Sequence, residues 1–327
     1  MYTLITGCAG YIGSHVSKML YETNNKLIII DNLLTGKLSN CKYGIFINAD
    51  ITDINDIENK VFNKYKITNI IHIAGKAFVS ESFQKIDEYY RVNVIGTINI
   101  LNMMVKYNIK NIIFSSSCAV YGNTSVLPIT EETILNPISP YGTTKKICED
   151  IIINYGKTTN IKYVLLRYFN VAGNDFSGEV LDNENNLKRI IPTIIFKAIK
   201  QELVQINGNN YETKDGTCVR NYVHVIDLAN AHINSLHYLE SNANNDSLIC
   251  NIGSNENYSI MDIIKLVENY TNIKIKYAFK QKLNGDPAVV YCKNELARIK
   301  LNWYPKYDIH DIIKSYIQLI DSNIQNI

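Results

Sequence analysis

The seven cysteines of this 327-residue chain include no close pair and no CxxC motif. A dispersed, odd set is typical of free thiols in a reducing compartment, and it excludes a small secreted scaffold held by disulfides. We therefore expect a cytoplasmic protein. The six histidines are also dispersed, and the two on one predicted helix, His232 and His237, are spaced poorly for one metal-binding face. The sequence thus predicts no metal site.

Neither sign of charge dominates, since 33 Lys and Arg stand against 31 Asp and Glu for a net charge of +2. Balanced, scattered charge gives no electrostatic basis for binding nucleic acid or an anionic membrane. Long apolar runs are lacking too. A run such as Ile190–Ile199 is interrupted by Pro192 and Lys197 and is too short to span a bilayer. We expect no signal peptide, because the first predicted strand begins at residue 2.

Strands and helices alternate along the first half of the chain. Short apolar runs predict strands at residues 2–6, 26–31, 44–48, 69–74, 110–116 and 161–167. Helical spacing of apolar residues predicts helices between them, at residues 13–21, 53–64, 87–107 and 139–155. This alternation predicts an α/β fold with a Rossmann-like, doubly wound parallel sheet.

The second half is less regular. It contains predicted helices at residues 190–200 and 225–239, a third opened by a capping box at Ser259 and Asp262, and a final one from residue 308. Residues 182–188, rich in Asn and Glu, are expected to form a surface loop. We predict a dinucleotide-binding domain over residues 1–175 and a smaller, mixed α/β substrate domain over residues 176–327, with some segments crossing back to the first.

Three glycines, Gly7, Gly10 and Gly13, follow the first predicted strand and open a helix. Glycines there permit a tight turn, close approach of a pyrophosphate and tight packing of helix on strand, while the helix N-terminus faces the phosphates. The alternative is a plain turn between strand and helix. Asp31 ends the second strand, where a carboxylate accepts both ribose hydroxyls and repels a 2′-phosphate, which favours NAD over NADP. Asp50, after the third strand, is placed to reach the adenine.

Tyr141 and Lys145 lie one turn apart on a predicted helix, and so on one face. An ammonium beside a phenol lowers its pKa from about 10 toward neutrality, which would make Tyr141 a general base. Ser117 can hydrogen-bond the same substrate oxygen. In a chain with 23 tyrosines, such a Tyr–Lys spacing also arises by chance on a surface.

Further motifs extend over residues 4–303. They are Thr6-Gly-Cys-Ala-Gly-Tyr-Ile-Gly-Ser-His15, Asp31-Asn32-Leu33, Asp50-Ile51, His72-Ile-Ala-Gly75, Asn93-Val-Ile-Gly-Thr97, Ser115-Ser-Ser-Cys-Ala-Val-Tyr-Gly122, Leu166-Arg-Tyr-Phe-Asn170, Asp215-Gly-Thr-Cys-Val-Arg220 and Gly285-Asp286-Pro. With the glycine loop and the Tyr–Lys pair, they resemble the UDP-glucose (UDP-galactose) 4-epimerases of the extended short-chain dehydrogenase/reductase superfamily.

The resemblance implies a reaction and its ligands. UDP-glucose and UDP-galactose would be interconverted by oxidation at C4, rotation of the 4-keto sugar and return of the hydride. The catalytic residues would be Ser117, Tyr141 and Lys145. The NAD-binding residues would be Gly7, Gly10, Tyr11, Ile12, Gly13, Asp31, Asn32, Asp50, Ile51, Ala74, Asn93, Ser115, Tyr141, Lys145 and Phe169. The residues that bind the UDP-sugar would be Ser117, Asn170, Arg220, Asp286 and Val290, with Arg220 at the diphosphate.

Two further expectations come from the same resemblance. A homodimer would form through the helices at residues 87–107 and 139–155. Val290, five residues after Gly285, stands where a bulky Tyr excludes N-acetylated sugars in resembling enzymes, so its small size would admit them.

Four positions depart from the resembling enzymes, all on the nucleotide side. Leu283, preceded by Lys282, replaces an Arg; Arg189 replaces an Asn or His; Asn207 replaces an aromatic residue; and Asn221 replaces an Asp. An altered nucleotide pocket is therefore expected.

Three alternative functions stay open. The first is another sugar-nucleotide enzyme, such as a dehydratase, a decarboxylase or a UDP-glucuronate epimerase. Cys118-Ala119 argues against elimination, because resembling dehydratases carry Asp-Glu there. The second is a net dehydrogenase with exchangeable NAD. The third is a non-catalytic dinucleotide-binding protein, although such a protein has no need of a base.

Overall fold

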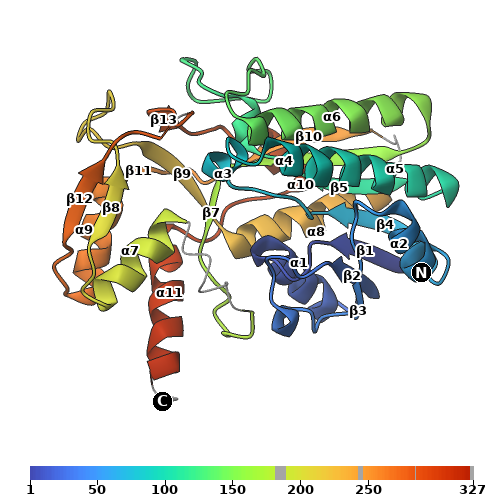
Figure 1. Cartoon of the computed structure of the whole chain (residues 1–327), viewed down its shortest axis with the longest axis horizontal. Coiled ribbons are helices and arrows are strands. Elements are labelled where there is room, and N and C mark those ends of the chain that lie inside the picture. Colours follow the sequence, from blue (N-terminus) through green and yellow to red (C-terminus); the bar gives the residue numbers. More distant parts are fainter. Residues whose placement is uncertain (181–188, 242–245, 284, 325–327) are drawn as a thin grey trace.

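Seven parallel strands form the central sheet of the computed structural model, which describes residues 1–180, 189–241, 246–283 and 285–324 (Figure 1). Their order is β10-β6-β5-β4-β1-β2-β3. The strands are β1 (Tyr2–Thr6), β2 (Leu27–Asp31), β3 (Ile45–Asn48), β4 (Ile67–His72), β5 (Asn111–Ser115), β6 (Lys162–Tyr168) and β10 (Leu248–Ile252). The predicted doubly wound parallel sheet is confirmed. The loop expected at residues 182–188 lies outside the described residues.

Helices cover both faces of this sheet, which is why most of its strands are continuous apolar runs. On one face α1 (Tyr11–Glu22) packs against α8 (Val225–Ser241). On the other face lie α5 (Gly96–Lys106) and α6 (Pro140–Thr158) (Figure 1). Ser139 caps α6 by accepting a hydrogen bond from the Gly142 N–H, and Pro140 occupies its first turn. The helix that carries Tyr141 and Lys145 therefore has a fixed start.

Two predicted helices contain π-helical turns. Asp53 caps the first, as expected, but α2 (Ile54–Ile57) continues as a π segment, Glu58–Phe62. The second runs through α4 (Ile86–Tyr89), a π segment at Tyr90–Ile95 and α5. A π turn widens the helix by one residue and often marks a functional site. Apolar periodicity predicted the helices but could not reveal this change of pitch.

A second core is built mainly from the later part of the chain. Four short strands, β7 (Asn170–Ala172), β9 (Val219–His224), β11 (Asn257–Ser259) and β13 (Val289–Val290), form one sheet, and β8 (Val204–Asn207) pairs with β12 (Tyr277–Lys280). The helices of this core are α7 (Ile190–Ile199), α9 (Ile260–Thr271) and α11 (Ile309–Ile324). Helix α10 (Glu295–Leu301) instead packs in the first core, against α8 and β10. The predicted capping box of α9 is confirmed. None of these six strands was predicted from the sequence.

Short helices complete the connections of the first half. They are α3 (Val79–Ser82) and the 3₁₀ turns Leu38–Asn40 and Cys118–Val120.

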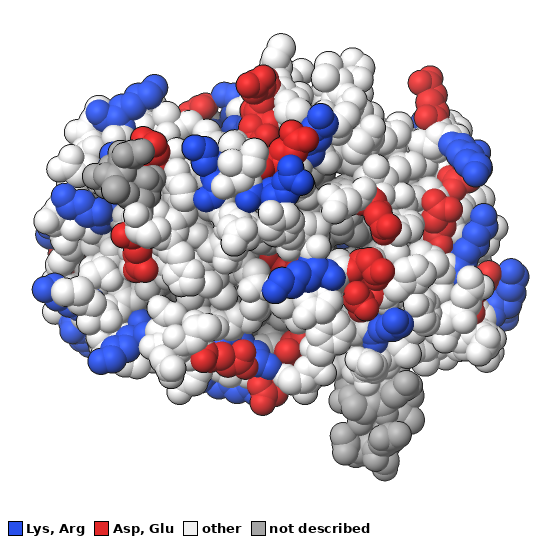
Figure 2. Space-filling model, turned by 180° about the vertical axis from the view of Figure 1, so that it is seen from behind, with Lys and Arg blue, Asp and Glu red and all other residues white. Residues whose placement is uncertain are grey.

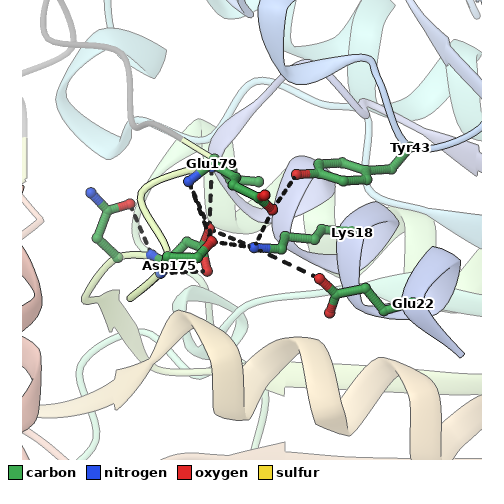
Figure 3. Close-up of polar contacts among 8 residues, drawn as sticks. Lys18, Glu22, Tyr43, Asp175 and Glu179 are labelled. Carbon is green, nitrogen blue, oxygen red and sulfur yellow. Dashed lines mark hydrogen bonds and ion pairs between the residues drawn. The ribbon is translucent and has the colours of Figure 1, made fainter.

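An ion-pair network, shielded around Lys18 and Asp175 and open to solvent at Glu22 and Glu179, joins α1 to the segment after β7 (Figure 3). The Lys18 Nζ contacts Asp175 Oδ2 at 2.8 Å and Glu179 Oε2 at 2.9 Å, and the side chain of Lys18 is only 7% exposed. The Tyr43 hydroxyl also donates to Glu179, at 3.0 Å. The start of the second half is thereby fixed to the helix that follows the glycine loop.

Charges of both signs are mixed over the face shown in Figure 2, without a large area of one sign. This distribution agrees with the balanced composition. Within the described ranges, no helix combines the length and apolarity needed to cross a membrane.

Candidate active site

The glycine loop lies where β1 and β4 leave the sheet, the point at which strand order reverses and α/β proteins bind ligands. Gly7 has φ +77°, and a Cβ there would lie 2.7 Å from the Ala74 nitrogen. A Cβ on Gly13 would lie 2.1 Å from the Gly7 oxygen. Both positions therefore require glycine.

Gly10 differs from the other two glycines, because a Cβ there would meet only the Gly7 oxygen, at 3.4 Å. The backbone of α1 begins at this open point, and Gly10 provides no side-chain cap for its first N–H groups. These groups fit the pyrophosphate of a dinucleotide. Ile12 packs against the core and the Tyr11 hydroxyl donates to the Gly173 oxygen at 2.5 Å, so both side chains point into protein.

Asp31 ends β2 beside this loop. Its Oδ2 accepts from the Ala9 N–H at 3.0 Å and its Oδ1 from the Leu33 N–H at 2.8 Å, which leaves further lone pairs for ribose hydroxyls. Burial raises the pKa of Asp31, and the hydrogen bonds from Leu33 and Ala9 oppose that rise. The carboxylate is therefore oriented by the backbone on both sides.

Asn32 and Asp50 join the ends of β2 and β3, since Asn32 Nδ2 donates to Asp50 Oδ2 at 3.1 Å. Burial acts to raise the pKa of Asp50, but hydrogen bonds from Thr52 and Asn32 outweigh it and lower the pKa. Ile51 is only 6% exposed and packs under Gly96, so its side chain belongs to the core.

The end of β5 meets α6 at the three predicted catalytic residues. Lys145 Nζ donates to the Ser115 oxygen at 2.8 Å and lies 4.7 Å above the Phe114 ring. Tyr141 lies beside Ser117, whose Oγ accepts from the Ala119 N–H at 3.2 Å. The structure thus brings Ser117, Tyr141 and Lys145 together.

The pKa of Tyr141 does not follow the expectation. Burial raises it well above its ordinary value, Tyr168 adds to the rise, and the hydrogen bond with Ser117 opposes it. Burial also lowers the pKa of Lys145 to about 8, because it disfavours the ammonium. The expectation that Lys145 lowers the pKa of Tyr141 is wrong for this geometry, since the ammonium is directed to the Ser115 carbonyl and not to the phenol.

A continuous wall connects the glycine loop to Lys145. Ala74 touches Gly7, and a Cβ on the next residue, Gly75, would lie 3.0 Å from Asn93 Oδ1 and 3.6 Å from Lys145 Nζ. Asn93, in the π segment, accepts from the Lys76 N–H at 2.8 Å and donates to Thr144 Oγ1 at 3.0 Å. The cofactor loop is therefore linked to the Tyr–Lys helix through Ala74, Gly75 and Asn93.

Ser115 and Phe169 fill the base of this region. The Ser115 hydroxyl is hydrogen-bonded to His232 Nε2 at 2.9 Å, and Phe169 is 3% exposed. Both side chains are therefore held within the protein, and the Ser115 carbonyl is the group that meets Lys145.

The predicted substrate residues gather around β9. Arg220 pairs with Asp286, and its other terminal N–H groups donate to the carbonyls of Val219 (2.8 Å), Pro287 (2.7 Å) and Ala288 (3.3 Å). Both terminal nitrogens of the guanidinium thus have protein partners. The Tyr211 hydroxyl holds the second oxygen of Asp286, at 2.9 Å.

Val290 pairs with Arg220 in the sheet, and Asn170 pairs with Tyr222, two residues further along β9. Val290 stands next to Arg220 in the β13–β9 register and packs in one cluster with Val120 and Phe169, against Cys118. Asn170 Nδ2 donates to the Asn221 carbonyl at 3.3 Å. Because Cys118 follows Ser117, this cluster borders the end of β5 where Tyr141 lies.

Comparison with known proteins agrees with this arrangement. Residues 4–316 match the family described as GDP-mannose 4,6 dehydratase. A UDP-glucose 4-epimerase from Lactobacillus helveticus is 39% identical over 96% of this chain and 95% of its own length. One from Halalkalibacterium halodurans is 36% identical over 94% of this chain and 91% of its own.

Two solved structures extend the match. UDP-glucose 4-epimerase from Brucella ovis, in complex with NAD, is 37% identical with a TM-score of 0.91, over 96% of both chains. The Bifidobacterium longum enzyme, in complex with NAD+ and UDP, is 32% identical with a TM-score of 0.93 over 100% of both. The chain belongs to the UDP-glucose 4-epimerase family. The resemblance predicted from the sequence is confirmed.

The departures from the epimerase pattern have local structural roles. Asn221 donates to the Glu256 carbonyl at 2.8 Å and accepts from the Ser254 N–H at 2.9 Å, so its amide holds the loop before β11. The Arg189 guanidinium lies 3.7 Å from the centre of the Tyr11 ring. Both side chains thus contact protein elements beside the site.

The other departures lie at the edge of the β8–β12 pair. Lys282 donates to the Asn210 carbonyl at 2.7 Å and lies 4.4 Å above the Tyr211 ring. Leu283 is 43% exposed, and Asn207 pairs with Lys280 at the end of β8. The Lys282 ammonium therefore lies next to Leu283 in the chain. It is held against the segment of Asn210 and Tyr211, and Tyr211 in turn contacts Asp286.

Sequence analysis of this epimerase-family site missed two buried polar groups. Thr6 Oγ1 bonds His72 Nδ1 at 2.7 Å, and His72 Nε2 bonds Thr97 Oγ1 at 3.0 Å, which ties β1 to the helix carrying Asn93. Glu149 and Arg167 form a buried ion pair behind β5. Glu149 could have been noticed, because it lies one turn after Lys145 on the same helical face.

Proposed function

We propose that this chain is an NAD-dependent 4-epimerase that interconverts UDP-glucose and UDP-galactose. The observation that carries the proposal is the meeting of Ser117, Tyr141 and Lys145 at the end of β5, linked to the glycine loop through Ala74 and Gly75. A dinucleotide bound along this path would extend from the start of α1 to the Tyr–Lys pair. Membership of the epimerase family supports the same reaction.

The NAD site would consist of backbone at one end and side chains at the other. The N–H groups that follow Gly10 would hold the pyrophosphate, Asp31 the adenosine ribose, and Lys145 the nicotinamide ribose. The remaining predicted NAD-binding residues would line the path between them. When bound, NAD+ supplies the hydride acceptor for C4 and a positive ring charge that favours the Tyr141 phenolate.

Tyr141 would take the proton from the C4 hydroxyl of the sugar and later return it. Because burial raises its pKa, Tyr141 keeps its proton until positive charge enters the site. Ser117, beside Tyr141, would orient the sugar hydroxyl toward the phenol oxygen. Such positioned acid–base catalysis contributes about 10²–10⁴-fold to a rate.

The UDP-sugar would lie against β9 and β13. Arg220 suits a diphosphate, because a guanidinium fork matches phosphate oxygens. Its pairing with Asp286 means that diphosphate binding would exchange one carboxylate contact for a phosphate contact. Asn170, at the start of β7, would contact the sugar nucleotide from the neighbouring strand.

Val290 would define the space beside the C2 substituent of the sugar. It lies in the cluster that borders Ser117 through Cys118, and valine leaves the volume that a tyrosine ring would fill. The same site would therefore accept UDP-N-acetylglucosamine and UDP-N-acetylgalactosamine as well.

A homodimer would form through the helices α4–α5 and α6. Several apolar side chains along the first of these are exposed: Ile86 (50%), Tyr90 (37%), Ile95 (45%) and Val105 (49%). Burying them against a second copy would remove this surface from water.

The proposed function is tested by incubating the purified protein with UDP-galactose, without added NAD, and measuring UDP-glucose. Epimerisation has no net redox change, so retained NAD suffices for many turnovers. A 4-keto-6-deoxy product would indicate a dehydratase. Turnover that requires added NAD+ and accumulates NADH would indicate a net dehydrogenase.

A further inference from the structure

Three successive turns of α6 contact three successive residues at the end of β5. Tyr141 lies beside Ser117, and Lys145 donates to the Ser115 carbonyl at 2.8 Å. One turn deeper, the carboxylate of Glu149 accepts a hydrogen bond from the Ser116 hydroxyl. Glu149 thus extends the row of the Tyr–Lys pair by one helical turn, and it is only 1% exposed.

Arg167, on the neighbouring strand β6, holds Glu149 in one orientation. Its Nε lies 3.0 Å from Oε1 and 3.1 Å from Oε2, and its Nη2 lies 2.6 Å from Oε2. The far side of the guanidinium donates to the Tyr121 hydroxyl at 3.0 Å, which in turn donates to Asn251 at 2.7 Å. The carboxylate is therefore fixed between a planar fork and Ser116.

Burial of this pair needs a reason other than stability. Removing two charges from water often costs more than their attraction returns, and apolar replacements of a buried pair are often neutral or stabilising. The Glu149–Arg167 pair instead lies directly behind the residues that would do the chemistry. A geometric or electrostatic contribution to that chemistry would explain its place.

We propose that Glu149 is a positioning residue: it fixes Ser116, and through it Ser117, against Tyr141, and its negative charge keeps Lys145 protonated. This inference rests on the proposed function. Glu149 would position Ser116 through the hydrogen bond that the Ser116 hydroxyl donates to it. Its negative charge would act on the Lys145 ammonium, which lies one helical turn away.

The groups around Lys145 support the electrostatic part. Burial lowers the pKa of Lys145 to about 8, and the nearby Cys148 and Glu149 oppose that fall. His72 on β4 is neutral at working pH, because burial and Lys145 lower its pKa to about 3. Arg167 on β6 is also charged, and it faces Glu149. Without bound NAD+, Tyr141 stays protonated, since burial raises its pKa. Removing the charge of Glu149 would take a negative charge away from Lys145 and would leave the positive charge of Arg167 unpaired. Each of these two changes favours the neutral form of Lys145.

Three variants separate the two contributions. Glu149→Gln removes the charge, Ser116→Ala removes only the bond to Glu149, and Tyr121→Phe removes bonds on the far side of Arg167 as a control. We expect Ser116→Ala to lower kcat for UDP-galactose about 10- to 100-fold, with KM changed less than threefold, because small misplacements at a reacting centre cost about that much. We expect Glu149→Gln to move the alkaline fall of the kcat–pH profile to lower pH by about one unit. Tyr121→Phe should lower Tm without either kinetic change.

The outcomes distinguish this inference from the proposed function. A wild-type protein that does not epimerise UDP-galactose would contradict the function itself. With an active wild type, a Ser116→Ala variant at the wild-type kcat would overturn the inference. An unchanged pH profile in a folded Glu149→Gln variant would overturn it equally. If Glu149→Gln does not fold, the kcat of Ser116→Ala decides.

Discussion

The backbone N–H of Ala9 donates to Oδ2 of Asp31 at 3.0 Å, so the acidic end of β2 is fixed to the glycine loop that follows β1. Two segments that would hold opposite ends of an adenosine diphosphate are thus a single rigid unit. The orientation of the carboxylate depends on the protein and not on the ligand, which bears directly on cofactor choice.

We expect Asp31→Ser to weaken NAD binding and to relax the exclusion of NADP, because the carboxylate that accepts the ribose hydroxyls and repels a 2′-phosphate is lost. Asp31→Asn keeps an oxygen that can accept from the Ala9 N–H but removes the negative charge. It therefore separates the loss of charge repulsion toward a 2′-phosphate from the loss of that hydrogen bond. Mass spectrometry of the nucleotide released by denaturation should find NAD or NADH in the wild type. Recovery of NADP from the wild type would refute this assignment.

Tyr141→Phe should reduce turnover by about 10²–10⁴-fold, the usual effect of removing a positioned acid–base group, with little change in Tm. Tyr155→Phe is a matched control, because Tyr155 lies on the same helix and its hydroxyl donates to Asn102, at 2.7 Å, away from the site. Steady-state kinetics with UDP-galactose would measure both. Near-wild-type turnover in Tyr141→Phe would remove Tyr141 from the mechanism.

Val290→Tyr should abolish activity on UDP-N-acetylgalactosamine and spare activity on UDP-galactose, because a ring beside the C2 position acts as a steric switch. The comparison is kcat/KM for the two substrates in wild type and variant. Val290→Leu is the control for a modest increase in size. The idea fails if the wild type ignores the acetylated substrate, or if Val290→Tyr loses both substrates equally.

Light scattering at micromolar concentration should give about twice the 37.3 kDa mass of the chain. Ile95→Glu should shift this mass toward that of the monomer, because it places a charge among the exposed apolar residues of α4–α5. Ile299→Glu, at a position 71% exposed on α10, is the matched control. A fully active wild-type monomer would exclude the dimer as a requirement.

The pH dependence of stability should report Asp227. This residue is fully buried, its Oδ2 accepts from the N–H groups of Lys306 and Tyr307 at 3.0 Å each, and burial raises its pKa to about 6. Between the ordinary value of 3.8 and 6, the folded state binds more protons than the unfolded state, so this group lowers stability as pH rises.

Asp227→Asn should therefore remove a decline of about 1–3 kcal/mol in the free energy of unfolding between pH 4 and 7. Urea unfolding across that range would measure it, with Asp308→Asn as a control because Asp308 is an exposed helix-capping carboxylate. A variant that follows the wild-type curve at every pH would contradict the assignment to Asp227.

The sequence predicted the first half of the fold closely, because buried parallel strands are continuous apolar runs and the glycines mark one junction. It did not predict β7 to β13. Val289–Val290 is a strand of two residues, too short for any period, and it exists because it pairs with Arg220. Tertiary pairing, not local propensity, forms such strands.

The site residues, like the strands, were predictable where their contacts are local in sequence and not where they are long-range. Spacing alone indicated the Tyr–Lys pair and the glycine loop, since those contacts lie within one or two turns of chain. The partner of Arg220 could not be predicted, because Asp286 is 66 residues away. The direction of the pKa of Tyr141 could not be predicted either, since it depends on burial under several elements.

Strand β10 closes the sheet late in the chain. Until residue 252 has been synthesised, β6 is an edge strand whose N–H and C=O groups are unpaired along one side, a template for pairing with another chain. A fragment that ends near residue 175 would present that apolar edge permanently, and we expect it to aggregate. The nascent protein carries the same hazard for a shorter time, so its yield in a cell should depend on chaperones that shield the edge until β10 arrives.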